Sequence, residues 1–98
     1  MESIELLVIL EVTGLKDKEK FEKHVKKEGF QLVPEEDFVY TAKSSTTTFA
    51  TKAYILEVFK KGLEKTGFDS CNLAFLLNET PYPPYVYDKT TNDFEEVK

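Results

Sequence analysis

The stretch that most constrains the fold is residues 4–12, Ile-Glu-Leu-Leu-Val-Ile-Leu-Glu-Val, the most apolar run in the chain. Its short length and its β-branched residues favour a strand over a helix. Because side chains alternate along a strand, one face carries only apolar residues, namely Leu6, Val8, Leu10 and Val12. The other face carries Leu7 and Ile9 between Glu5 and Glu11. We expect the first face to meet the core and the second to be exposed or covered by something else.

The composition narrows the class of protein. The 98 residues are enough for one domain with its own core. Cys71 is the only cysteine, so a disulfide framework or a cysteine-rich zinc site cannot form within one chain. We predict that Cys71 is a small buried hydrophobic residue at the head of a strand, with a reactive thiol as the alternative. All 13 basic residues are lysines and the net charge is −5, which disfavours tight nonspecific binding to nucleic acid.

The chain shows no sign of a membrane or export segment. The apolar run at residues 4–12 is far too short to span a bilayer, and the opening Met1-Glu2-Ser3 lacks the basic region of a secretory signal. We therefore expect a soluble cytoplasmic protein without membrane association.

Two helices and three further strands are predicted after the first strand. Asp17 can cap a helix over residues 18–28, and the hydroxyl-rich run at 44–48 can supply the N-cap of a helix that reaches Thr66. Glycines end both helices, and strands are predicted at 30–33, 38–43 and 72–78. The positions of the second helix expected to be buried are Phe49, Ile55, Leu56, Val58, Phe59 and Leu63.

The order strand, helix, strand, strand, helix, strand predicts a ferredoxin-like α+β sandwich. In that fold an antiparallel sheet with spatial order 4-1-3-2 has both helices on one face. We place this domain at residues 1–80 and a proline- and tyrosine-rich extension at 81–98. Residues 85–87 can form a short edge strand, and the acidic tail from Asp88 onward is expected to be disordered.

The second face of this sheet is the strongest functional clue. Leu7 and Ile9 of the first strand would lie beside Ala74 and Leu76 of the fourth, and a contiguous apolar patch on a small domain usually has a cover. A second copy of the chain could cover it, or the segment at 81–87 could fold across it. We predict a homodimer, with the interface formed by Leu7, Ile9, Ala74, Leu76, Tyr82, Tyr85 and Tyr87.

Other polar features carry weaker signals. His24 borders the apolar stripe of the first helix and has no sequence partner for acid–base chemistry, so we expect a structural histidine. The run Glu35-Glu36-Asp37 suits a solvated turn better than a metal site, since divalent ions need converging ligands. The hydroxyl run at 44–48 could bind phosphate at a helix N-terminus, although it lacks glycine and arginine. We predict no catalytic residue, metal or cofactor.

Three functions remain open. The first is a small interaction or regulatory protein of the inhibitor, antitoxin or phage-effector type, whose acidic strands and tail suit a basic protein partner. The second is a metal-dependent ribonuclease, because the strand order is similar in plan to Cas2-like and VapD-type proteins. Those families carry an aspartate at the end of the first strand, and Glu11 stands near that position, where two copies facing each other across a dimer could hold Mg²⁺. The third is binding of a small molecule or nucleic acid, with lysines on the helices and Tyr40, Tyr85 and Tyr87 available for stacking.

Overall fold

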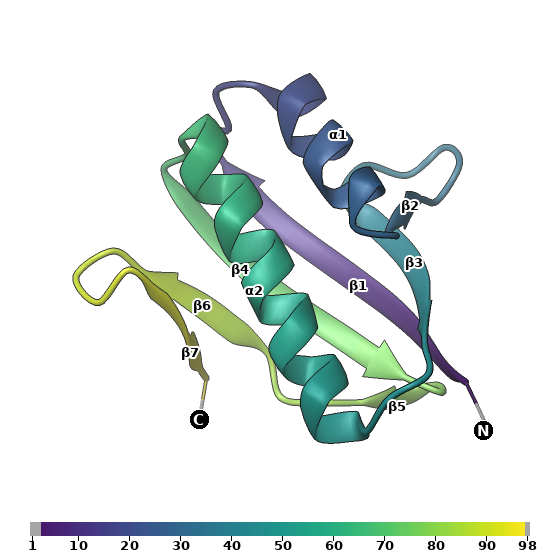
Figure 1. Ribbon diagram of the computed structural model, residues 1–98. Helices are drawn as coiled ribbons and strands as arrows, with labels where there is room; N and C mark the ends of the chain where they lie inside the picture. The colour runs from purple at the N-terminus through teal and green to yellow at the C-terminus, as the bar shows by residue number, and fades with distance from the viewer. Residues whose placement is uncertain (1–2, 98) are drawn as a thin grey trace.

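The computed structural model describes residues 3–97 and is a mixed α+β structure with two helices and an antiparallel sheet (Figure 1). The elements in chain order are β1 (Ile4–Thr13), α1 (Lys18–Lys27), β2 (Gln31–Leu32), β3 (Val39–Ser44), α2 (Thr48–Thr66), β4 (Ser70–Leu77), β5 (Thr80–Pro81), β6 (Tyr85–Asp88) and β7 (Asp93–Glu96). The α+β class and the antiparallel sheet are confirmed. The sheet has seven strands, which is more than the sequence predicted.

The apolar first strand lies in the middle of the sheet. The strand order is β2-β3-β1-β4-β6-β7, and β5 pairs with β4. Val8 of β1 is opposite Tyr40 of β3 on one side and Phe75 of β4 on the other. The core-facing residues of β1, Leu6, Val8 and Leu10, are buried, while the residues between them are partly or fully exposed, as expected for an antiparallel sheet covered on one face.

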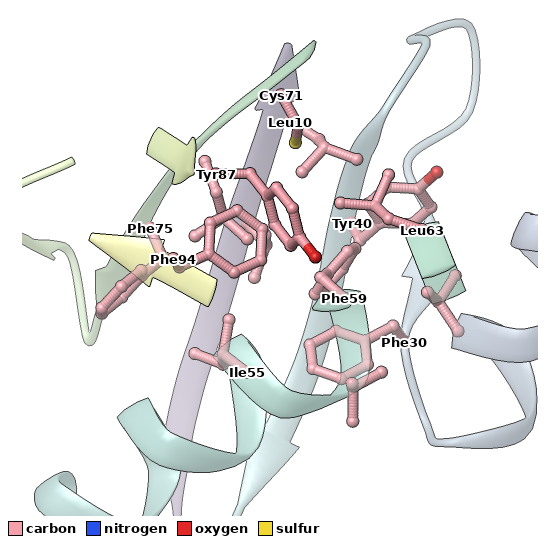
Figure 2. Packing of buried hydrophobic residues seen from close by; sticks show 14 of the residues in the cluster. Leu10, Phe30, Tyr40, Ile55, Phe59, Leu63, Cys71, Phe75, Tyr87 and Phe94 are labelled. Carbon is pink, nitrogen blue, oxygen red and sulfur yellow. The ribbon is translucent and has the colours of Figure 1, made fainter. Parts of the chain in front are cut away.

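Both helices lie on the same side of the sheet (Figure 1). The core fills the space between the helices and the sheet. Phe21 of α1, Phe59 of α2 and Tyr40 of β3 form its aromatic centre, and Figure 2 shows Phe59 beside Tyr40. The ring centroids of Tyr40 and Phe59 are 5.5 Å apart. Leu6, Val8 and Leu10 face this core, as the alternation along β1 predicted.

The helices begin and end at residues whose chemistry favours a boundary. The Asp17 side chain accepts a hydrogen bond from the Lys20 N–H at 3.0 Å, and the Thr47 hydroxyl accepts one from the Ala50 N–H at 3.1 Å. Thr47 is therefore the N-cap that the hydroxyl run was expected to supply. Gly67 caps the C-terminus of α2 with a φ of 83°, a conformation that glycine adopts without steric cost.

The prediction of a disordered tail is wrong. β7 pairs with β6, and Phe94 is buried against the ring of Tyr87, with centroids 5.4 Å apart. The Asp88 carboxylate accepts a hydrogen bond from the Thr90 N–H at 2.8 Å and so stabilises the turn between the two strands. The predicted division of the chain after residue 80 falls within β5.

The prediction that Phe49 is buried is also wrong. Its side chain is 83% exposed on the first turn of α2. Buried positions of this helix begin at Thr51, whose hydroxyl donates to the Thr47 carbonyl at 2.8 Å. The first buried apolar residue of α2 is therefore Ile55, six residues after Phe49.

Candidate functional site: the open face of the sheet

The structure brings together the four aliphatic residues predicted to form a patch. Leu7 is opposite Leu76 and Ile9 is opposite Ala74 in the β1–β4 pair. All four point to the side of the sheet away from the helices, because their neighbours in sequence are buried beneath α1 and α2. Ile9 is 42% exposed. We call this surface the open face.

Two valines extend the apolar patch beyond β1 and β4. Val39 of β3 is opposite Ile9, and Val86 of β6 is opposite Asn72. Val86 is 38% exposed. Sequence analysis did not assign either valine to the patch, although the alternation along β3 and β6 was a signal that could have found both.

Charged residues border the patch at both ends of β1. Glu5 is opposite Lys43 of β3 at one end, and Glu11 is opposite Asn72 of β4 at the other. A hollow of about 670 Å³ lies at the Glu5 end, with Leu7, Thr41, Lys43, Leu76 and Glu79 among its lining residues. The open face is therefore an apolar strip with a depression at one end and a mainly acidic border.

The three tyrosines predicted to belong to the interface lie elsewhere. Tyr82 and Tyr85 stack on the ring of Phe75 on the helix side of the sheet, with centroids 5.6 and 6.0 Å away. Tyr87 is buried there, and its hydroxyl donates to Glu64 of α2 at 3.2 Å. Residues 81–87 thus run beside β4 and do not fold across the open face. Val86 points to this face, and Pro81 shares it because Pro81 is opposite Leu76.

Glu11, the candidate of the ribonuclease hypothesis, is exposed on the open face at the end of β1. Within residues 3–97 no group of three or more histidine, cysteine, aspartate or glutamate side chains is placed to hold a metal ion. A carboxylate pair at this position would require a second molecule. At this position one chain therefore supplies only the Glu11 carboxylate, and the described residues form no metal site around it.

The remaining polar candidates have structural partners. His24 Nε2 lies 3.1 Å from the Val58 carbonyl oxygen and connects α1 to α2. Asp37 of the acidic loop pairs with Lys18 at 2.8 Å. Cys71 is 1% exposed, and burial raises the pKa of its thiol to about 12, which keeps the thiol protonated at neutral pH.

The tyrosines proposed for base stacking are not free to do so. Tyr40 is 1% exposed and Tyr87 is 8% exposed, so neither presents a ring face to solvent. Tyr85 is partly buried and stacks one ring face on Phe75. A stacking platform requires an exposed aromatic face. The exposed aromatic residues in the described chain are instead Phe49, at 83% exposure, and Tyr54, at 43%.

A pair of buried polar atoms was missed by the sequence analysis. Glu22 Oε2 on α1 and the Tyr40 hydroxyl on β3 are both buried without a hydrogen-bond partner among the described residues. The sequence holds no signal for this pair, because the proximity of a helix residue to a strand residue depends on how the two elements pack.

No helix in the described chain is long and apolar enough to cross a bilayer. Comparison with protein-family models found no match, and comparisons with curated proteins and with solved structures found none either.

Proposed function

We propose that this protein is a small acidic interaction or regulatory module that binds a protein partner through its open face and has no catalysis of its own. The observation that supports this proposal is the cluster of Leu7, Ile9, Ala74 and Leu76, which lie together on the side of the sheet away from both helices. Val39 and Val86 enlarge the cluster across four neighbouring strands. An apolar patch of this kind on a small domain is typical of a binding surface.

The strength of such binding can be bounded. Full burial of one aliphatic side chain is worth about 1.5–3 kcal/mol, and these side chains are already partly buried in the free protein. Association costs about 4 kcal/mol or more in lost translational and rotational freedom. The apolar strip alone therefore gives weak binding, and a tight partner must also contact the charged border.

The negative charge of the chain favours a basic partner. Glu5 and Glu11 lie at the two ends of the strip, and the whole chain has a net charge of −5. A basic protein surface with an apolar centre is complementary to this arrangement. A second copy can cover the same strip as a weak homodimer, since it matches the apolar residues but repeats the negative charge.

We also propose a ferredoxin-like topology and a cytoplasmic location for this protein. The neighbours of the central strand give the partial order β4-β1-β3-β2, which supports a ferredoxin-like core within residues 1–80 that β6 and β7 extend. A cytoplasmic location is consistent with a single protonated thiol and with an exposed surface rich in lysine and glutamate.

Two charge variants test the binding surface. Ile9→Lys places a cation in the centre of the open face, whereas Leu32→Lys introduces the same charge at a residue of equal exposure, 41% against 42%, on the opposite side of the sheet. We expect a partner captured by the wild-type protein to be lost with Ile9→Lys and kept with Leu32→Lys. Equal capture by both variants would contradict the proposal.

A metal-dependent ribonuclease of the Cas2-like or VapD type is the second candidate. The ribonuclease hypothesis is supported by the position of Glu11, which is exposed on the open face. A dimer that meets through this face could place the two Glu11 carboxylates near each other. Mg²⁺-dependent RNA cleavage that Glu11→Ala abolishes would establish this function. If RNA is not cleaved at any Mg²⁺ concentration and binding of a protein partner requires Ile9, the interaction module is supported and the ribonuclease is not.

A further inference from the structure

A second hollow lies on the helix side of the molecule, between α1 and the β2–β3 hairpin. Its volume is about 580 Å³, and its walls include Val25, Phe30 and Leu32 as well as Glu22 and Tyr40. Leu32 is the strand partner of Tyr40 and so shares its face of the sheet. This hollow is therefore separate from the open face.

The two polar atoms of this hollow lack partners. Tyr40 is 1% exposed, yet its hydroxyl has no hydrogen bond to any described residue, and the same holds for Glu22 Oε2. Figure 2 shows the Tyr40 hydroxyl pointing outward from the aromatic cluster, away from Phe59. Buried polar groups in proteins are nearly always hydrogen-bonded, so an unpaired couple on the wall of one hollow points to a ligand.

Neighbouring charged residues do not supply the missing bonds. Asp37 is paired with Lys18 at 2.8 Å, and Lys23 lies 3.7 Å from Glu19. Lys23 and Lys26 also line the hollow, but among the described residues no ion pair joins either of them to Glu22. Glu22 Oε2 is thus left as an acceptor without a donor.

The chemistry of the two atoms defines what would fit. Burial, together with the negative charges of Glu22 and Asp37, raises the pKa of Tyr40, so its hydroxyl stays protonated. A carboxylate only accepts hydrogen bonds, and a phenol can accept one as well as donate one. A group that donates to both oxygens and carries positive charge satisfies the pair, whereas an anion would be repelled by Glu22.

We propose that this hollow binds a small primary ammonium compound. Its ammonium group donates one hydrogen bond to Glu22 Oε2 and one to the Tyr40 hydroxyl oxygen. Its aliphatic body lies against Val25, Phe30 and Leu32. Glu22 is only partly buried as a residue, so its carboxylate can turn to admit the ligand.

Titration with matched small probes tests this proposal. The full-length protein is titrated at pH 7 with butylammonium, butyrate and butanol, and amide resonances are followed by NMR. We expect saturable shifts around the hollow with butylammonium only. Glu22→Gln should weaken binding about tenfold or more, because a charge-assisted hydrogen bond is lost. Tyr40→Phe should weaken it several-fold.

Two controls isolate the site. Glu36→Gln removes an equal charge from the exposed loop and should leave binding unchanged, and Ile9→Lys should also leave it unchanged. Equal affinity of Glu22→Gln and the wild-type protein would overturn the proposal, as would equal shifts with butyrate or no saturable binding of butylammonium. Since Glu22 is only partly buried and glutamine has nearly the same size and shape, that variant remains informative even if Tyr40→Phe fails to fold.

Discussion

Cys71 is the one thiol of the chain and sits in the core side of β4, opposite Val12 of β1. Burial disfavours the charged thiolate and raises the pKa of Cys71 from 9.0 to about 12. The thiol is therefore a packing group at neutral pH and gives no support to a nucleophilic function.

This shift predicts a pH dependence of stability. Between about pH 9 and pH 12 the unfolded chain loses the thiol proton while the folded chain keeps it, so the free energy of unfolding should fall as the pH rises. The slope approaches about 1.4 kcal/mol per pH unit from this one group. Urea unfolding at pH 8 and at pH 10 measures this change in the free energy of unfolding.

Cys71→Ala serves as the control for the other groups that titrate in this range. The variant should lose the part of the slope that belongs to the thiol and keep the rest. An identical pH dependence in the two proteins would show that Cys71 is ionised as easily in the folded state as in the unfolded one.

The β6–β7 hairpin is the element that the sequence described least well. Between residues 88 and 97 only Phe94 and Val97 are large and apolar, which is too sparse a pattern to predict a strand. The structure places Phe94 at 7% exposure against Tyr87, whose ring also contacts Phe68 with centroids 4.9 Å apart. A single aromatic residue thus ties the C-terminal strand to the core.

Phe94→Ala should therefore destabilise the protein by about 3 kcal/mol, because removal of a buried phenylalanine leaves a cavity beside Tyr87. Val97→Ala is the matched control, since Val97 is 46% exposed and should change stability by less than about 0.5 kcal/mol. Urea unfolding of the three proteins gives both values. A loss below about 0.5 kcal/mol for Phe94→Ala would mean that the Phe94 side chain does not anchor β7 to the core.

Local chemistry explains which elements could be predicted. The capping residues Asp17 and Thr47 and the terminal Gly67 mark helix boundaries in the sequence itself, and the observed helices agree with them within one or two residues. Alternation along β1 likewise predicted the patch at Leu7 and Ile9. These features depend on neighbours in sequence.

Features that depend on packing between distant elements were not predicted. The proline-rich segment gave no register, so the tyrosines at 82, 85 and 87 were assigned to the open face when Val86 is the residue that points there. The proximity of Glu22 and Tyr40 arises only when α1 docks on the sheet. Alternation separates Val86 from Tyr85 and Tyr87, but only the pairing of β6 with β4 shows which side of the sheet each residue faces. Sequence periodicity carries no information about the proximity of Glu22 and Tyr40.

At the scale of the whole molecule, the account rests on one apolar sheet face and a net charge of −5. Two copies that meet through this face repel each other through their charges, so added salt should strengthen the homodimer by screening that repulsion. A basic partner should respond in the opposite direction, because salt weakens the attraction between unlike charges.

Sedimentation velocity over a range of protein concentrations is the most direct test that the open face is a binding surface. The wild-type protein should show a reversible dimer whose share grows with protein concentration and with salt, Leu32→Lys should behave in the same way, and Ile9→Lys should stay monomeric. A wild-type protein that remains monomeric at every concentration and salt level would contradict the predicted homodimer, and an Ile9→Lys variant that dimerises as well as the wild type would contradict the assignment of the open face as the binding surface.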